Sequence, residues 1–308
     1  MKEGGQPDRA PKAAVTLDAL LPSAIARKAE DVGVAKAGMD ALSLLVLAIL
    51  AGAFIGLGAM AATIMWTGVA PDLSFGVARM LGGLVFALGL ILVVLGGAEL
   101  FTGNNLMVIA AASRRIGLGA LLRAWTIVFI GNMIGAIGTA VLVFLAGQHT
   151  LADGGVGQTM LAIGNAKAEL PFAQAFFLGI LCNVLVCLAV WLCYGAHTTT
   201  DKLLAILFPI AAFVAAGFEH SVANMYFIPL AMIVKTVAGD AFWAQIGAAP
   251  DAFPAVSVVG LMRNLVPVTL GNILGGGVLV GLVYWFVYLR RAGPVDSDQC
   301  CICERTGK

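Results

Sequence analysis

Long stretches without a charged residue restrict most strongly how this chain can fold. No Asp, Glu, Lys or Arg occurs between Asp40 and Asp72, and between residues 80 and 113 the only charge is Glu99. Of the 308 residues, 60% are hydrophobic and 11% are charged, whereas soluble domains carry about 25% charged residues. A bilayer core of about 30 Å needs about 20 helical residues, so these stretches are long enough to cross it. The sequence therefore predicts an all-α membrane protein.

The charge-free stretches predict six transmembrane helices. The second and the fifth are longer than one straight crossing requires. Glycine and polar residues interrupt both, at 96–97 and 102–105 in the second and at 217–225 in the fifth, so we expect both helices to be broken at mid-membrane. Backbone of that kind is tolerated only where protein or a water-filled cavity satisfies it. The predicted spans are residues 43–66, 80–113, 125–147, 172–195, 203–234 and 265–289.

Charges outside the spans predict how the chain is organised. Residues 1–33 form an N-terminal tail in which 23–34 have the pattern of an amphipathic surface helix, and residues 34–291 form the six-span transport domain. Residues 292–308 form a polar tail that contains Cys300, Cys301 and Cys303. Basic residues concentrate in the tails and in alternate loops, so the positive-inside rule places both termini in the cytoplasm. No basic arm indicates a nucleic-acid partner.

Two short patterns recur along the chain. Segments 97–105 and 217–225 share a Gly-x-Glu sequence followed by Asn at a constant separation of 120 residues, and segments 131–135 and 271–275 share Gly-Asn-x-x-Gly at a separation of 140. The copies are three predicted crossings apart, and an odd number of crossings inverts the second copy. Inverted repeats with broken helices are typical of transport proteins, whose sites lie where the breaks meet.

The second copy contains an ionisable pair inside an apolar span. Glu219 and His220 are costly at that depth unless they face a cavity or a partner, so their usual explanation is functional. Histidine changes charge near physiological pH and can supply a positive charge or a proton. Two structural explanations remain open, namely a histidine satisfied inside a helix bundle and a carboxylate that bonds the free amides of a broken helix.

These motifs resemble those of a known family. Gly-Ala-Glu-Leu-Phe-Thr-Gly-Asn-Asn at 97–105 and Gly-Phe-Glu-His-Ser-Val-Ala-Asn-Met at 217–225 are similar to the two signatures of the formate/nitrite transporter family, and the resemblance extends over about residues 30–291. It implies an aquaporin-like inverted repeat of two three-helix halves, a homopentamer with a pore in each protomer, and a bacterial inner membrane location.

The resemblance also implies which residues form the pore. Thr102 and His220 would face each other between two apolar constrictions, with Lys167 attracting the substrate and Asn183 assisting its passage. Glu219 and Asn224 complete the second signature. The constriction positions that match the family are Phe86, Leu90, Leu100, Phe101 and Phe213.

The expected function is transport of small monovalent anions, with formate as the first candidate and protons as partners. An anion pays a large desolvation cost at an apolar constriction, whereas its neutral acid does not, and a buried histidine could resolve this difference. A pore for nitrite, hydrosulfide or lactate is the alternative within the same class. A membrane anchor of an oxidoreductase is the alternative from another class, although only His220 is central enough to bind haem. We expect no cofactor and no enzymatic activity.

Overall fold

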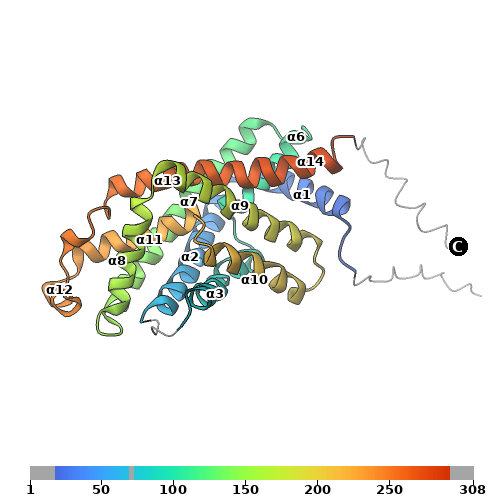
Figure 1. Ribbon diagram of the computed structural model, residues 1–308. Helices are drawn as coiled ribbons and strands as arrows, with labels where there is room; N and C mark the ends of the chain where they lie inside the picture. The colour runs from blue at the N-terminus through green and yellow to red at the C-terminus, as the bar shows by residue number, and fades with distance from the viewer. Residues whose placement is uncertain (1–17, 69–72, 292–308) are drawn as a thin grey trace, which may run out of the picture.

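The computed structural model describes residues 18–68 and 73–291, and the cysteine-containing tail lies outside them. Every regular element in these two ranges is helical (Figure 1). The first half contains α1 (Pro22–Ala37), α2 (Ala41–Trp66), α3 (Phe75–Phe86), α4 (Leu88–Gly96), α5 (Phe101–Asn104), η1 (Asn105–Met107), α6 (Val108–Ala112) and α7 (Leu118–Leu145). The second half contains η2 (Gln148–Thr150), α8 (Gly155–Glu169), α9 (Phe172–Gly195), α10 (Thr199–Ala215), α11 (Ser221–Val237), α12 (Asp240–Ile246), η3 (Pro250–Ala252), α13 (Val258–Asn272), η4 (Ile273–Leu282) and α14 (Val283–Tyr288).

Five helical segments in the described ranges are long and apolar enough to cross a membrane. They are Ala41–Trp66, Phe75–Gly96, Leu118–Leu145, Phe172–Gly195 and Val258–Tyr288. The remaining predicted span, 203–234, is divided between α10 and α11, which have 17 residues each. The predicted all-helical membrane fold is confirmed, and the fourth span has the predicted bounds.

The third and sixth spans begin earlier than predicted. α7 begins at Leu118 rather than at 125, and α13 begins at Val258 rather than at 265. Each of the two added segments contains an arginine, and a charged residue was expected to lie outside a span. Arg123 lies on the exposed side of α7 and donates to the carbonyl of Met39 at 3.2 Å, and Arg263 is exposed on α13. Long cationic side chains at the end of a span can reach water, so they do not end the helix.

Both predicted breaks are present, but one of them is displaced. The second span is interrupted at residues 97–100 and the fifth at residues 216–220. Residues 102–105 and 221–225 were predicted to belong to the interruptions, and this was wrong because they are helical in α5, η1 and α11. Gly97 and Gly217 have φ angles of 79° and 73°, a left-handed conformation in which glycine commonly ends a helix. The helices therefore end at these glycines and begin again after a short extended segment.

A short helix precedes the spans of each half. α1 runs to Ala37, across the boundary predicted at residue 33, and packs against α6 and α9. In the second half, α8 packs against α11 and α13, although it lies between the predicted spans 125–147 and 172–195, where no helix was expected. The charged residues at 153, 167 and 169 concealed this helix, whose other side is buried. Lys36 and Lys167 lie in the last turns of α1 and α8, so the two halves place a lysine equivalently.

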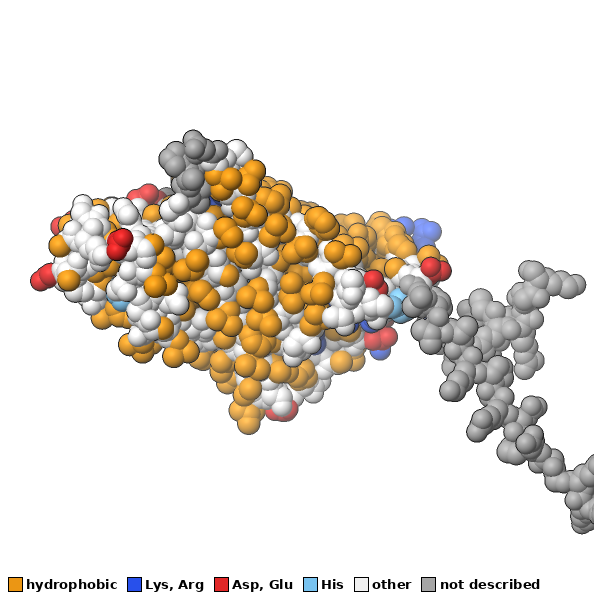
Figure 2. All heavy atoms as spheres, turned by 90° about the horizontal axis from the view of Figure 1, so that it is seen from below, with side chains coloured by type: hydrophobic (Ala, Val, Ile, Leu, Met, Phe, Trp, Pro, Cys, Tyr) orange, Lys and Arg blue, Asp and Glu red, His pale blue; other side chains and the backbone are white. Residues whose placement is uncertain are grey.

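The aromatic residues of α12 are buried, whereas many large apolar side chains elsewhere are exposed. Phe242 and Trp243 of α12 are both buried, because their rings pack against each other and against His149 and Phe253. Large apolar side chains such as Ile130, Ile134 and Leu142 are exposed. Figure 2 shows apolar side chains over most of one face, with charged side chains mainly near its margins. Such a surface is suited to lipid or to neighbouring protomers.

Candidate functional site

Two buried asparagines hold the helix breaks in place. Asn132 accepts a hydrogen bond from the backbone N–H of Phe101 at 2.8 Å and donates to the carbonyls of Glu99 and Ala48 at 2.9 and 2.7 Å. The side-chain oxygen and both N–H groups of this amide are therefore hydrogen-bonded. Because the broken backbone lacks helical partners, these side-chain bonds replace the missing ones.

Asn272 repeats the arrangement at the second break. It accepts from the N–H of Ser221 at 2.9 Å and donates to the carbonyls of Glu219 and Gly179 at 3.0 and 2.8 Å. The Gly-Asn-x-x-Gly repeat was recognised from the sequence, but its asparagines were given no role. The constant separation of 140 residues was the signal that could have identified them.

The two repeated carboxylates form ion pairs and do not bond the amides of the breaks. Glu219 accepts from Lys167 Nζ at 2.7 Å and from Asn224 Nδ2 at 2.6 Å. Glu99 makes the equivalent contacts with Lys36 at 2.9 Å and with the Asn104 side chain at 2.8 Å. The structure thus brings together the predicted residues Lys167, Glu219 and Asn224. At the first break it adds Lys36, which the sequence did not single out, to the repeated residues Glu99 and Asn104.

His220 and Thr102 contact each other where the two breaks meet. Thr102 Oγ1 lies 2.9 Å from His220 Nε2, and both side chains are buried, with 0% and 3% exposure. The backbone N–H of Ala223 donates to His220 Nδ1 at 3.1 Å, which makes His220 the N-cap of α11. Since Nδ1 accepts, the hydrogen of the neutral ring is on Nε2, and this hydrogen is donated to Thr102. The hydroxyl hydrogen of Thr102 remains available for another acceptor.

The backbone of Thr102 is supported from α9. Asn183 Nδ2 and Cys187 Sγ both donate to the Thr102 carbonyl at 3.3 Å, and Asn183 also donates to the carbonyl of Asn272 at 2.7 Å. The π-helical segment η4 packs against α9 and brings Gly276 directly onto Asn183 and Cys187. Asn183 therefore connects the backbone of Thr102 to that of Asn272, whose side chain holds the second break. Its side chain lies behind the Thr102–His220 pair and lines neither of the cavities described next.

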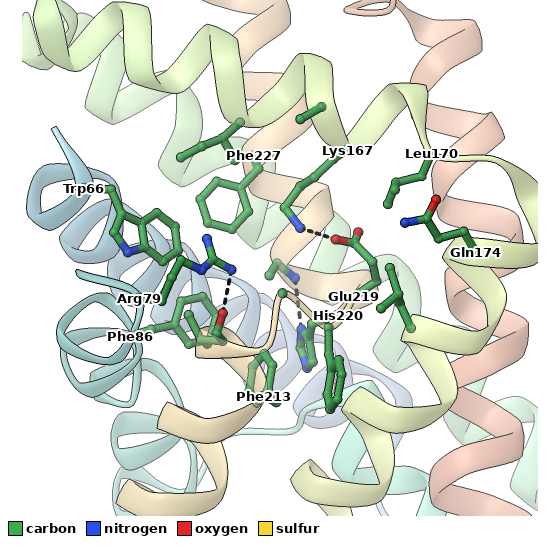
Figure 3. A pocket seen from close by; sticks show the side chains of 17 residues that line it. Trp66, Arg79, Phe86, Lys167, Leu170, Gln174, Phe213, Glu219, His220 and Phe227 are labelled. Atoms are coloured by element: carbon green, nitrogen blue, oxygen red, sulfur yellow. Dashed lines mark hydrogen bonds and ion pairs between the residues drawn. The ribbon is translucent and has the colours of Figure 1, made fainter. Parts of the chain in front are cut away.

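Two cavities approach the Thr102–His220 pair from opposite directions. The first, here called the Lys167 cavity, has a volume of about 290 Å³ and is lined by Arg79, Phe86, Lys167, Phe213, Glu219 and His220 among others (Figure 3). The second, the Lys36 cavity, has a volume of about 260 Å³ and is lined by Lys28, Lys36, Leu90, Glu99, Leu100 and Lys202 among others. Both cavities contain more cationic than carboxylate side chains in these linings.

The order of lining residues along the helices shows that the cavities lie on opposite sides of the breaks. Along α3 and α4, Phe86 lines the Lys167 cavity, whereas Leu90 lines the Lys36 cavity. Along α10, which runs the other way, Lys202 lines the Lys36 cavity and Phe213 lines the Lys167 cavity. The Phe86 and Phe213 rings meet edge to face with centroids 5.7 Å apart. Apolar side chains thus separate the cavities beside the histidine.

One predicted constriction residue is placed elsewhere. Phe101 lines neither cavity, because its ring packs edge to face against Trp125 and Phe129 with centroids 6.1 and 5.0 Å away. Its neighbour Leu100 points into the Lys36 cavity instead. A change of direction at the helix break separates these adjacent side chains, and the linear sequence does not reveal which of the two faces the path. Arg79, which the sequence analysis did not consider, lines the Lys167 cavity.

Metal chemistry finds no support among the described residues. No group of three or more His, Cys, Asp or Glu side chains within residues 18–68 and 73–291 is arranged to hold a metal ion.

Comparison with known proteins assigns the chain to a family. The profile of the formate/nitrite transporter family matches residues 23–286, from the start of α1 into α14. The chain belongs to the formate/nitrite transporter family. It is therefore a multi-pass membrane protein from a family of anion channels and transporters, and the alternative of an oxidoreductase anchor was wrong.

Named relatives and solved structures agree with this assignment. The formate channel FocA of Escherichia coli is 44% identical over 280 residues, which cover 91% of this chain and 98% of the relative. A probable formate transporter of Methanothermobacter thermautotrophicus is 38% identical, covering 80% of this chain and 89% of the relative. A pentameric formate channel with formate bound has a TM-score of 0.77 at 44% identity, covering 81% of this chain and 98% of that structure. An ion channel of the same family has a TM-score of 0.73 at 30% identity, covering 86% and 99%.

Proposed function

We propose that the chain forms a homopentameric channel in the bacterial cytoplasmic membrane that conducts formate through a path within each protomer. The observation that carries this proposal is the buried Thr102–His220 contact between two cavities rich in cationic side chains. The similarity to a pentameric formate channel with formate bound supports both the substrate and the assembly. The basic residues of the tails and alternate loops support two cytoplasmic termini, so the Lys36 cavity opens inward and the Lys167 cavity outward.

The apolar barrier determines what the polar pair must do. A bare anion that passes Phe86, Phe213, Leu90 and Leu100 loses most of its hydration, which costs several kcal/mol unless the protein replaces it (about 2–7 kcal/mol for a neutral polar group and more for a charge). The Thr102 hydroxyl is the donor that replaces water at this point. It accepts from the Nε2–H of His220, and a hydroxyl that already accepts a hydrogen bond is a better donor.

The histidine adds a dependence on pH. In the neutral state the ring is held by the Ala223 N–H at Nδ1 and presents no charge to the path. When Nδ1 takes up a proton, two donors face each other, the Ala223 bond is lost, and the ring becomes a cation beside Thr102. In this state His220 supplies a positive charge to the passing anion or gives it a proton, so that it crosses as the neutral acid.

Competition flux tests the proposal. The purified protein in liposomes should release labelled formate, and formate, nitrite, hydrosulfide and lactate should be compared as competitors over a series of pH values. Empty liposomes control for formic acid that crosses lipid directly. Formate flux above this control supports the proposal. Its absence, or flux of nitrite or hydrosulfide with no response to formate, would exclude formate as the substrate.

A further inference from the structure

The positive charge that faces the Lys167 cavity does not come from Lys167. Its ammonium group forms an ion pair with Glu219 at 2.7 Å, and the same carboxylate is held by Asn224 at 2.6 Å and by Asn264 at 3.3 Å. An ion pair at this distance has almost no net charge when seen from the cavity. Attraction of an anion to this entrance therefore requires another cation.

Arg79 supplies the unmatched charge. Its guanidinium lines the cavity, and no carboxylate in residues 18–68 or 73–291 lies within ion-pair distance of it. Figure 3 shows Arg79 beside Trp66 on one side of the cavity, with Lys167 and Glu219 paired across from it. The guanidinium carbon lies 4.8 Å from the centre of the Trp66 ring.

The orientation of the guanidinium leaves part of it available. Nη2 donates to the carbonyl of Val214 at 2.7 Å and Nε donates to the carbonyl of Ala215 at 3.3 Å. These bonds cover the last carbonyls of α10, which carry the partial negative charge of the helix end. Nη1 takes no part in them, so its two hydrogens and one on Nη2 remain free. That edge of a guanidinium suits a small carboxylate or another monovalent anion.

We propose that Arg79 is the anion-binding group of the Lys167 cavity and holds a small monovalent anion next to Trp66 before it reaches the Phe86–Phe213 barrier. This inference rests on the proposed anion-channel function and assigns the entry site. Arg79 also shields the anion from the carbonyl end of α10. The Lys167–Glu219 ion pair then holds the second break in place, and Arg79 is the group that attracts the anion.

Iodide quenching of Trp66 fluorescence tests the site without any measurement of transport. Iodide is a monovalent anion that quenches on contact, and acrylamide is a neutral quencher of similar reach. The Trp66 signal is the difference between the full-length protein and its W66F variant, at constant ionic strength. We expect R79Q to lower the iodide quenching constant about fivefold, as loss of one partly exposed charge near the ring implies, while the acrylamide constant changes little.

Matched variants separate charge from packing. R79K restores the charge and should recover most of the iodide quenching, whereas R263Q removes an exposed arginine of α13 that lines neither cavity and serves as the control. In the unsubstituted protein, sodium formate should reduce iodide quenching of Trp66 and neutral formamide should not, which requires no variant. Equal iodide quenching in R79Q and the unsubstituted protein, or an equal fall with acrylamide, would overturn the assignment.

Flux relates this site to the proposed function. In liposomes, R79Q should raise the outer formate concentration that gives half-maximal flux about fivefold, with a smaller change at saturating formate. If the unsubstituted protein conducts formate and R79Q has the same half-saturating concentration, the role of Arg79 is refuted and the proposed function is not. Absence of formate flux in the unsubstituted protein would refute the proposed function, and the iodide experiment would then decide whether Arg79 binds anions.

Discussion

Replacing Asn272 by alanine removes the amide that holds the second break. Three hydrogen bonds of 2.8–3.0 Å are lost. The N–H of Ser221 and the carbonyl of Glu219 are left without these partners in a buried segment outside the helical ladder, and each unsatisfied group costs about 1–3 kcal/mol. Water that enters the vacated space recovers part of this cost, so we expect N272A to lose about 3 kcal/mol of stability. By the usual relation for domains of this size, the melting temperature should fall by about 5 °C or more.

The assay is thermal unfolding in detergent, followed by tryptophan fluorescence, with formate flux measured on the same preparation. N132A should behave similarly, because Asn132 makes the same three kinds of bond at the first break. T236A is the control, since the Thr236 hydroxyl is exposed and bonds only carbonyls of its own helix. If N272A melted within 1 °C of T236A and conducted formate normally, the claim that Asn272 holds the break would be refuted.

Gly276 and His149 can be tested in the same way. In G276A the added Cβ would overlap Asn183 and Cys187, so we expect a loss of about 1–3 kcal/mol of stability and reduced formate flux in the same assays. G138A is the control, because its added Cβ meets no atom within 4 Å. Equal melting temperatures and equal flux of the two variants would contradict the packing argument. Burial lowers the pKa of His149 from its ordinary value of 6.5, so the unfolded chain binds this proton before the folded chain does and stability falls as the pH drops below about 6.5. H149F keeps an aromatic ring stacked on Phe144 but does not titrate, so it should reduce the difference in melting temperature between pH 7.5 and pH 5.5. An unchanged difference would show that His149 does not contribute to the pH dependence of stability.

The sequence was sufficient to predict features that local periodicity and repetition encode. Glycines in over-long apolar runs indicated both breaks, the separation of 120 residues related them to each other, and the apolar run at 172–195 had the bounds of α9. The displaced first break shows a limit of this reasoning. Polar residues at 102–105 resemble a loop in an apolar run, yet Asn104 and Asn105 are buried and hydrogen-bonded inside helices, so their polarity serves tertiary contacts.

Features that depend on partners distant in sequence could not be predicted. Lys167 was expected to attract anions, but its charge is matched by Glu219, 52 residues away. Arg79 at the start of a span gave no sign that it reaches the end of α10. Phe101 and Leu100 are adjacent and apolar, and only the geometry of the break decides which of them faces a cavity. Charge balance and side-chain direction follow from the packing of the two halves.

The proposed role of His220, bonded to Thr102 between the two cavities, is to make formate passage depend on pH. The most direct test is formate flux of H220N over a pH series in liposomes, because asparagine preserves an N-cap for α11 but does not titrate. We predict that H220N folds and assembles normally and loses the pH dependence of the unsubstituted protein after subtraction of the empty-liposome signal. A pH profile in H220N identical to that of the unsubstituted protein would contradict the account.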